Sequence, residues 1–193
     1  MDIPWGDPRT KKFITNVGLI TTDGPAGPNI MAAEWTHMIS YEPGLIAICI
    51  SNENEATAKN IKKTKEFGVS ITSTAQSILS STSGKYSGTT YDKISAAKEL
   101  GFTFFKAKKI KTLMVEGAAL NIECKLVKAI LLGSHTMFVG EAVYTNLNEE
   151  KEPIAFHGGR YGSVAYTIEK PSEQERARIA AILEKHKKAK GKP

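Results

Sequence analysis

Residues Asn29 to Asn60 read NIMAAEWTHMISYEPGLIAICISNENEATAKN, and this stretch decides how the rest of the chain is interpreted. Its centre, from Leu45 to Ile50, is an unbroken apolar run with β-branched members. The run follows Pro43-Gly44, which is a turn signal, and stops where Ser51 introduces polar residues. Such a short, continuous apolar run is typical of a strand that is buried on both faces.

The segment after this strand favours an anion site. Small polar residues lead from Ser51 into a predicted helix that starts near Thr57. Free backbone N–H groups and the helix dipole point at whatever lies before a helix N-terminus. Thr57 and Lys59 would add a hydroxyl and a charge. A second interpretation stays open, in which Ser51, Asn54 and Thr57 only cap and turn the chain.

Length and composition indicate one globular domain with a tail. The chain has 193 residues, of which 41% are hydrophobic and 24% charged, and we expect a domain over residues 1–170 and a basic helix and tail over 171–193. No run approaches the ~20 apolar residues of a membrane helix, and the N-terminus does not resemble a signal peptide. Cys49 and Cys124 lie in strand-like surroundings, where we expect free thiols and a cytoplasmic location.

The positive charge of the chain is concentrated at its end. From Lys170 onward, eight Lys or Arg face three Glu, which leaves +5 of the formal +6 in this segment. A nearly neutral body argues against nucleic-acid binding as the main role. Binding of nucleic acid by the tail from Lys185 stays as a minor alternative.

Hydrophobic patterns along the body predict a mainly β protein. From Leu120 to Val127, apolar residues alternate with Asn121, Glu123 and Lys125, which we expect on the opposite face. Successive strands with short connections favour a closed antiparallel barrel with a few short helices and a C-terminal helix. The predicted strands are Lys12–Thr21, Asn29–Thr36, Leu45–Ile50, Phe67–Thr72, Leu120–Val127 and Thr136–Thr145. The predicted helices are Thr57–Thr64, Thr74–Ser83, Asp92–Leu100 and Ser172–His186, and the last would dock on the barrel or on a second subunit.

Two further segments contain residues suited to ligand binding. The predicted loop Ser80–Gly88 is rich in hydroxyls and Gly, which bind phosphate or a heterocycle edge, but also occur in any mobile surface loop. In the second segment, His157 and Arg160 flank two glycines that permit positive φ or close approach of the backbone to a ligand. A turn requires none of the imidazole of His157, the cation of Arg160 or the aromatic ring of Tyr161, so this combination indicates a functional role.

The order of these motifs resembles the flavin reductase-like family, which has an FMN-binding split β-barrel and includes flavoredoxins and ferric reductases. The resemblance covers roughly residues 13–166. The motifs that carry it are Asn29-x-x-x-Ala33-x-Trp35-Thr36, Pro43-Gly-Leu-Ile-Ala-Ile-x-Ile with Ser51, Ser83-Gly84, Leu120-Asn-Ile-Glu-Cys, Gly133-x-His-Thr-x-Phe-Val-Gly-Glu and His157-Gly-Gly-Arg-Tyr. Each motif is short, and it is the set in this order that is specific.

The resemblance implies a role for individual residues. His135 matches the position that faces the nicotinamide, although Ser134 stands where the family usually has Asp. Glu34 stands where a small residue is common, while Ala32 and Ala33 either leave room for a flat ring or fit a tight core. The residues implied to bind cofactor are Ala33, Glu34, Trp35 and Thr36 near the isoalloxazine, Ser51, Asn52, Asn54, Thr57 and Lys59 near the phosphate, and Ser83, Gly84 and Lys85 bordering the flavin. We add His157 and Arg160 as candidates, since Arg160 could meet a 2′-phosphate.

The expected activity is that of an FMN-dependent oxidoreductase, with hydride transfer from NAD(P)H to FMN and onward electron transfer to an acceptor. The cofactor carries the redox chemistry, so no catalytic triad or metal is required. Two alternatives stay open: a flavoredoxin-like electron carrier, and an FMN-binding protein without a nicotinamide site. A pyridoxamine-phosphate oxidase relative fits the motifs less well. The resemblance also implies a homodimer, and an electron-acceptor protein is a possible partner.

Overall fold

The computed structural model describes residues 1–4, 6–53 and 55–188, and it is mainly β with antiparallel sheets. The strands are β1 Ile14–Thr15, β2 Gly18–Thr22, β3 Asn29–Ala33, β4 Thr36–Tyr41, β5 Gly44–Ser51, β6 Glu66–Ile71, β7 Phe104–Lys106, β8 Leu113–Val115, β9 Leu120–Leu132, β10 His135–Leu147, β11 Ala155–His157 and β12 Arg160–Gly162. The helices are α1 Glu55–Thr64, α2 Ser77–Lys85, α3 Lys93–Glu99 and α4 Glu173–Lys185, with short 3-10 turns at Thr10–Lys12 and Thr74–Gln76.

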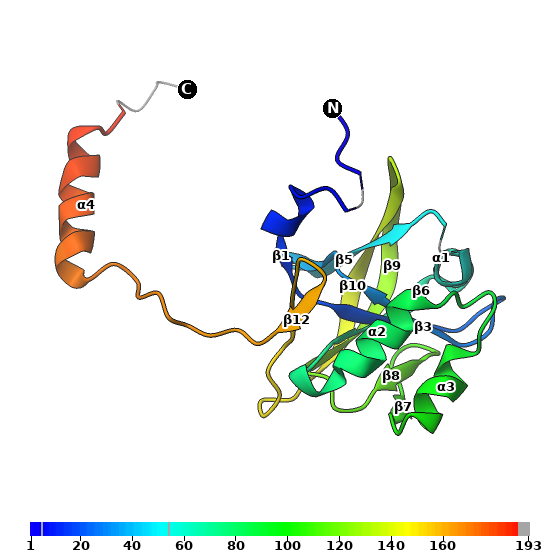
Figure 1. Ribbon diagram of the computed structural model, residues 1–193. Helices are drawn as coiled ribbons and strands as arrows, with labels where there is room; N and C mark the ends of the chain where they lie inside the picture. The colour runs from blue at the N-terminus through cyan, green and yellow to red at the C-terminus, as the bar shows by residue number, and fades with distance from the viewer. Residues whose placement is uncertain (5, 54, 189–193) are drawn as a thin grey trace.

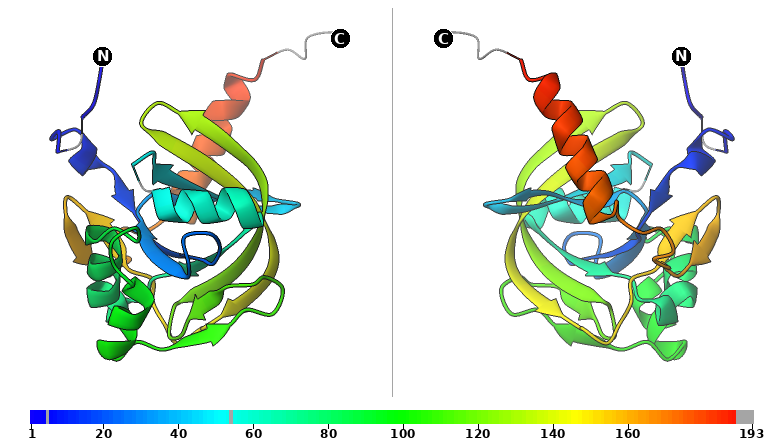
Figure 2. Two further views of the ribbon diagram at one scale, coloured as in Figure 1. Left: turned by 90° about the vertical axis from the view of Figure 1, so that its right-hand side faces the viewer. Right: turned by 90° about the vertical axis from the view of Figure 1, so that its left-hand side faces the viewer.

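The main sheet has seven strands in the order β3-β2-β6-β9-β10-β5-β4, and every neighbouring pair is antiparallel. Its two edge strands, β3 and β4, follow one another in the chain with only Glu34 and Trp35 between them. The backbone N–H of Cys49 in β5 donates to the carbonyl of Trp35 at 2.9 Å. The sheet therefore curls until its two edges meet at Glu34–Trp35, as the curved strands in Figures 1 and 2 show.

Both faces of the central strands are buried. Successive residues of β2 separate between two apolar clusters, with Ile20 inside the curled sheet beside Phe67 and Phe138, and Leu19 on the outer face beside Leu79 of α2. This explains the continuous apolar runs in the sequence, because a strand covered on both faces has no solvent side. The predicted strand Leu45–Ile50 is confirmed as β5.

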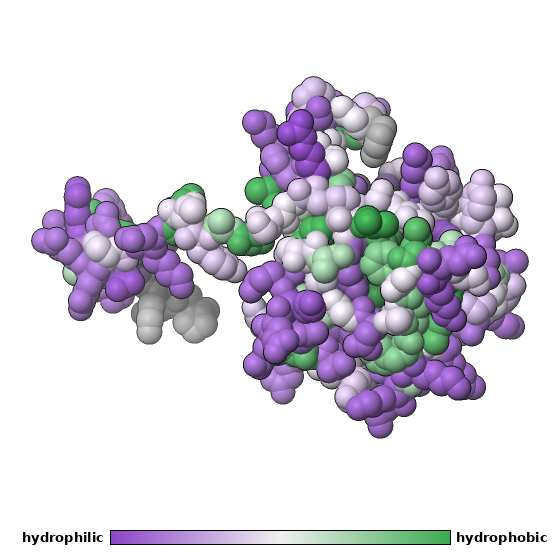
Figure 3. Space-filling view, turned by 60° about the horizontal axis from the view of Figure 1, so that its bottom comes forward, coloured by the Kyte–Doolittle hydropathy of each residue, from purple (hydrophilic) through white to green (hydrophobic). Residues whose placement is uncertain are grey.

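The C-terminal helix lies apart from this body. All described residues from 163 to 188 are exposed, and Figures 1 and 3 show α4 joined to the body only by a narrow connection. The expected docking of α4 on its own barrel is therefore absent from the described residues. The predicted division at residue 170 stays a prediction.

Three predicted boundaries were wrong. The strand expected over Lys12–Thr21 is two strands, because β1 pairs with β11 while β2 pairs with β3. The strand expected over Asn29–Thr36 ends at Ala33, and the chain turns into β4 where the sheet edges meet. The loop expected over Ser80–Gly88 is helical as far as Lys85, because Ser80 and Ser83 are buried under the outer face of the sheet and tertiary packing overrides their weak helix propensity.

The polar face predicted for β9 is only partly exposed. Asn121 and Glu123 are buried, whereas Lys125 is exposed. The Glu123 carboxylate accepts the backbone N–H groups of Lys108 at 2.8 Å and of Lys109. The loop between β7 and β8 thus covers this face, and its backbone donors are satisfied by the carboxylate that it buries.

Candidate functional site

Asn52 joins the end of β5 to the turn that carries His135. In the antiparallel register, His135 lies opposite Ser51. The Asn52 backbone N–H donates to Ser134 O at 3.0 Å, and its side-chain Nδ2 donates to Gly133 O at 3.0 Å. The Thr136 hydroxyl donates to Asn52 Oδ1 at 2.9 Å. Asn52, predicted as a phosphate ligand, therefore positions this turn.

His135, at the start of β10, forms an aromatic pair with Trp35, which lies between β3 and β4. The ring centroids are 4.5 Å apart and the ring planes are inclined by 36°. The Ser134 hydroxyl and His135 Nδ1 form a hydrogen bond of 2.9 Å. Because Trp35 is 48% exposed and His135 is half-buried, the pair offers a partly open flat surface. Ser134 orients the imidazole through this hydrogen bond.

The other residues of the Ala33–Thr36 segment point in different directions. Ala33 and Thr36 are buried, and the Thr36 hydroxyl donates to Ala33 O at 2.9 Å. A Cβ on Gly18 would lie 2.5 Å from Thr36 Oγ1, so the Thr36 side chain fills the space against β2. Glu34 is exposed, although partial burial raises the pKa of its carboxyl. Trp35 and Glu34 thus present side chains outward, while Ala33 and Thr36 are part of the core.

A second group of polar residues lies where α1 begins. Asn29 Nδ2 donates to Thr57 Oγ1 at 2.9 Å, and Asn29 Oδ1 is buried without a hydrogen-bond partner. A Cβ on Gly88 would collide with Asn29 Oδ1. A small hollow beside this group is lined by Asn29, Met31, Ala56, Thr57, Ser87, Gly88 and Lys93. The N-terminus of a helix, an unsatisfied polar atom and a glycine meet at this hollow.

Lys93 contributes a buried positive charge to the same hollow. It is 4% exposed, and its Nζ donates to Ser83 O at 3.1 Å. The ion pairs found among the described residues are Arg9–Asp7 and Lys187–Glu184, and neither involves Lys93. Burial lowers the pKa of Lys93 to about 8. A buried ammonium that pairs with no carboxylate among the described side chains is unfavourable, so the hollow is suited to an anion.

The cap of α3 fixes Lys93 at the start of this helix. The Asp92 carboxylate accepts the Ser95 backbone N–H at 3.0 Å and the Ser95 hydroxyl at 2.7 Å, and these bonds lower the pKa of Asp92. Ile94 and Ala97 anchor the helix in the outer apolar cluster. Lys93 therefore enters the hollow because its neighbours fix the first turn.

We expect Asp92→Ala to lower the free energy of unfolding by about 1 kcal/mol at pH 7, because a helix N-cap is lost. A lowered carboxyl pKa stabilises the fold above the ordinary pKa of Asp, and this contribution is lost as the pH falls through the folded-state value. The difference between variant and parent should therefore shrink on acidification. Urea titrations at several pH values measure it, with Asp92→Asn, which retains a capping oxygen, as the matched control. An equal loss in both variants would contradict the capping role.

Several residues predicted to bind the cofactor are not gathered at these groups. Lys59 is exposed on α1, and Lys85 is exposed at the end of α2, with its Nζ 6.0 Å from the centroid of the Tyr86 ring. A Cβ on Gly84 would lie 3.4 Å from Ala32 Cβ, so the small size of Ala32 and Gly84 lets α2 approach β3. Asn54 lies outside the described residues.

The His157–Arg160 segment forms a hairpin that is attached to other parts of the body. Gly158 and Gly159 have φ of 58° and 81°, as a tight two-residue hairpin requires, which explains both glycines. His157 Nε2 bonds the carbonyl of Lys11, and Tyr161 OH donates to Ser80 Oγ at 3.1 Å. Arg160 is exposed. These hydrogen bonds attach the hairpin to the N-terminal segment and to α2.

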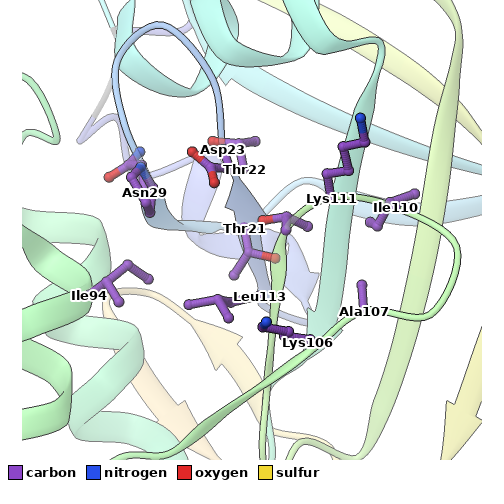
Figure 4. A pocket seen from close by; sticks show the side chains of 12 residues that line it. Thr21, Thr22, Asp23, Asn29, Ile94, Lys106, Ala107, Ile110, Lys111 and Leu113 are labelled. Carbon is purple, nitrogen blue, oxygen red and sulfur yellow. The ribbon is translucent and has the colours of Figure 1, made fainter.

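A cavity of about 390 Å³ lies beside the second group, between the β2–β3 turn and the β7–β8 hairpin (Figure 4). Its lining includes Thr21, Asn29, Ile94 and Leu113. None of the residues predicted from the sequence to bind a cofactor lines it. The predicted residues instead lie around the meeting point of the sheet edges and the start of α1.

Sequence reasoning missed Lys93 and assigned no role to Asn29 itself. Asn29 begins one of the motifs quoted for the resemblance, but Lys93 is one of 26 Lys and Arg residues and has no distinguishing neighbour. Only the packing of α3 reveals that its side chain is buried. Among the described residues, no group of three or more His, Cys, Asp or Glu could hold a metal ion. None of the described helices is long and apolar enough to cross a membrane.

Comparison with known proteins gives one consistent family. A model described as "Flavin reductase like domain" matches residues 10–165. An uncharacterized protein of Pyrococcus abyssi is 32% identical over 132 residues, which are 68% of this chain and 71% of the relative. A ferric-chelate reductase (NAD(P)H) of Archaeoglobus fulgidus is 28% identical over 64% of this chain and 70% of its own. The structure of the flavoredoxin of Desulfovibrio vulgaris (Miyazaki F) is similar with a TM-score of 0.72 and 26% identity, over 90% of this chain and 98% of that one.

Proposed function

Because the chain belongs to the flavin reductase-like family, we propose that it binds FMN and catalyses hydride transfer from NAD(P)H to the flavin, with onward transfer of electrons to an acceptor. When bound, the flavin supplies the redox chemistry. The observation that carries the proposal is the arrangement of two complementary groups, the Trp35–His135 aromatic pair and a buried cation beside the α1 N-terminus. The aromatic pair suits the flat ring of a nicotinamide, and the buried cation suits the phosphate of FMN.

The residues around the hollow fit the phosphate end of FMN. Lys93 would supply a positive charge, the start of α1 would supply N–H donors, and the Thr57 hydroxyl can donate while it accepts from Asn29. The unsatisfied Asn29 Oδ1 would accept a hydroxyl of the ligand. This assignment retains Thr57 from the sequence prediction and replaces Lys59 by Lys93 as the cation.

At the other group, we propose that the Trp35–His135 pair forms the surface on which the nicotinamide is positioned. The imidazole is oriented by Ser134, and the turn is fixed by Asn52. In this role His135 positions the substrate and transfers no hydride. The hydrogen bond between Ser134 and His135 supports the view that Ser at this position can replace the Asp that is usual in the family.

We expect His135→Ala to raise KM for NADH by about tenfold, because one positioning contact of roughly 1.4 kcal/mol is lost. The affinity for FMN should change by less than about twofold, because the phosphate group of residues is untouched. Ser134→Ala, which removes only the orienting hydrogen bond, should show a smaller rise. Steady-state NADH oxidation with FMN and a fluorescence titration of FMN measure the two effects. An unchanged KM in both variants would contradict the role of His135.

The alternative of an electron carrier without a nicotinamide site is favoured by one observation. The centroids of the Trp35 and His135 rings are only 4.5 Å apart. Trp35 therefore covers part of the face of His135 on which a nicotinamide would stack. A carrier would keep FMN through gel filtration and would be reduced by dithionite but not by NADH or NADPH. A reductase would be reduced by one of the two nucleotides.

We also propose that the protein is a cytoplasmic homodimer. Cys49 and Cys124 are both free thiols, as suits a reducing compartment. On β4, Met38, Ile39 and Tyr41 are 60%, 51% and 89% exposed, and β4 pairs on one side only, with β5. An exposed apolar edge strand needs a cover, and a second copy would provide it.

A further inference from the structure

The last described part of the chain forms an arm without contacts to its own body. We define the C-terminal arm as residues 163–188, of which every residue is exposed. The hydrogen bonds of the arm stay within it, such as the capping bonds between Ser172 and Glu175. Figure 3 shows apolar residues along the narrow connection between the body and α4. An isolated helix of 13 residues is only marginally stable in water, so α4 needs a partner surface.

Two hydrophobic patterns in the arm indicate such a surface. Val164, Tyr166 and Ile168 alternate with small or polar residues, and they are 49%, 93% and 92% exposed. This period of two is typical of a strand with one buried face. On α4, Ile179, Ile182 and Leu183 form a stripe at helical spacing and are also exposed. The described body covers neither pattern.

The body has a matching unfilled surface at β4. Met38, Ile39 and Tyr41 are exposed there, and β4 ends the sheet with one unpaired edge. A free edge strand offers backbone donors and acceptors to another extended segment. Val164–Ile168 has both the pattern and the unpaired backbone to serve as that segment.

We propose that the C-terminal arm of one copy lies across β4 of a second copy, with Val164–Ile168 as an added strand and the apolar stripe of α4 on the exposed residues beside it. The connection of ten residues, 163–172, can span up to roughly 35 Å when extended, which is enough to reach a neighbouring copy. An exchange of two arms covers both arms and both edges in one symmetric contact. The arm has about the 20–30 residues that each partner contributes to a standard interface.

This inference rests on the proposed homodimer and is independent of flavin chemistry. The family model ends at residue 165, so most of the arm lies outside the shared domain.

The test compares two surface variants of the full chain. The double variant Tyr166→Ser with Ile168→Ser should raise the dimer dissociation constant at least about tenfold, because buried aromatic and aliphatic anchors dominate interface energies. The control, Tyr91→Ser with Leu100→Ser, removes residues that are also exposed (55% and 54%) but lie on the body, and it should stay within about twofold. Sedimentation equilibrium measures both constants. An unchanged dissociation constant in the arm variant would contradict the proposed arm contact but not the proposed dimer. A full chain that is monomeric at every concentration would contradict both.

Hydrogen exchange locates the arm. The backbone amides of residues 164–168 should be protected in the dimer, and the protection should disappear on dilution into monomer. Protection that persists in the monomer would place the arm on its own body. Amides that become protected only with vesicles of phosphatidylcholine and phosphatidylglycerol would mark a membrane contact. Either result would overturn the proposal.

Discussion

Replacing Lys93 with Met is expected to lower the affinity for FMN by about 10- to 100-fold while the affinity for riboflavin stays within about twofold. Riboflavin lacks only the phosphate, so the ratio of the two affinities isolates the interaction with that group. Met has a similar length and fills the same buried position, which leaves α3 in place. Flavin fluorescence titrations of parent and variant give both affinities.

The size of this effect follows from the surroundings of Lys93. Lys93 is 4% exposed, and its ammonium donates to one carbonyl, that of Ser83. Charge-assisted hydrogen bonds in such a site are stronger than neutral ones. In the protein without ligand, burial lowers the pKa of Lys93 to about 8. The preference for FMN over riboflavin should therefore decline as the pH rises through and above this value, because Lys93 loses its proton.

A rise in pH should weaken the FMN preference that depends on Lys93 but should increase the free energy of unfolding of the ligand-free protein. The folded-state pKa of about 8 lies below the ordinary 10.5, so the unfolded chain binds more protons in this window and the free energy of unfolding should rise with pH there. Below pH 8 the cost of burying the charge is fully present. We expect Lys93→Met to stabilise the ligand-free protein at pH 7 and to abolish the rise.

Lys59→Met is the matched control for Lys93→Met. Lys59 lies on α1 two residues after Thr57 and was predicted from the sequence as the phosphate ligand, but its side chain is exposed. We expect its replacement to change FMN affinity by no more than about threefold, because exposed charges are screened. A large loss in Lys59→Met together with none in Lys93→Met would show that the sequence prediction was right and that the assignment to Lys93 is wrong.

Gly140→Ala is expected to lower the free energy of unfolding by about 3 kcal/mol, the upper part of the range for an overpacked core. The new Cβ would lie 2.5 Å from Phe67 Cζ and 2.8 Å from Cys124 Cβ. Phe67 and Cys124 are both fully buried, so neither can move aside without disturbing the inner apolar cluster. Chemical denaturation measures the loss.

The control for this substitution is Gly84→Ala. There the added Cβ would lie 3.4 Å from Ala32 Cβ, and the residue is helical. We expect a change within about 1 kcal/mol, since Ala favours a helix over Gly. Adding Phe67→Leu to Gly140→Ala should recover part of the loss, because the two positions share the same space. A fully additive double variant would contradict the packing explanation.

Much of the fold follows from hydrophobic patterns. The apolar run Leu45–Ile50 is β5, the alternation from Leu120 starts β9, and the predicted helix Asp92–Leu100 contains α3. Local residues determine these elements. Gly140 was quoted only as part of a motif of the resemblance. The structure explains why this position is glycine, because a Cβ there would collide with the ring of Phe67.

Features that depend on distant contacts could not be predicted in this way. The sequence around β4 has no alternation, because its exposed Met38, Ile39 and Tyr41 need a partner that the described body lacks. The polarity of Glu123 suggested solvent exposure, but the loop after β7 supplies its hydrogen bonds. Whether these side chains are buried or exposed depends on the distant segments that cover them.

Part of the candidate site could be predicted from sequence motifs, and part of it depends on distant contacts. The resemblance assigned Trp35, Ser51, Asn52 and His135 to different parts of the flavin and the nicotinamide, and the structure places them around the end of β5 and the turn before β10. It assigned no role to Lys93, which lies 36 residues after Thr57 in the sequence. A charge that is buried only by helix packing leaves no local pattern.

An absorbance spectrum of the purified protein with added FMN, recorded before and after anaerobic addition of NADH or NADPH, tests the central claim most directly. We expect flavin bands that stay with the protein through gel filtration or shift on titration, and that bleach with one of the two nucleotides. Bands that bleach only with dithionite would support the carrier alternative. A protein that stays colourless and takes up no added FMN would contradict the proposed function.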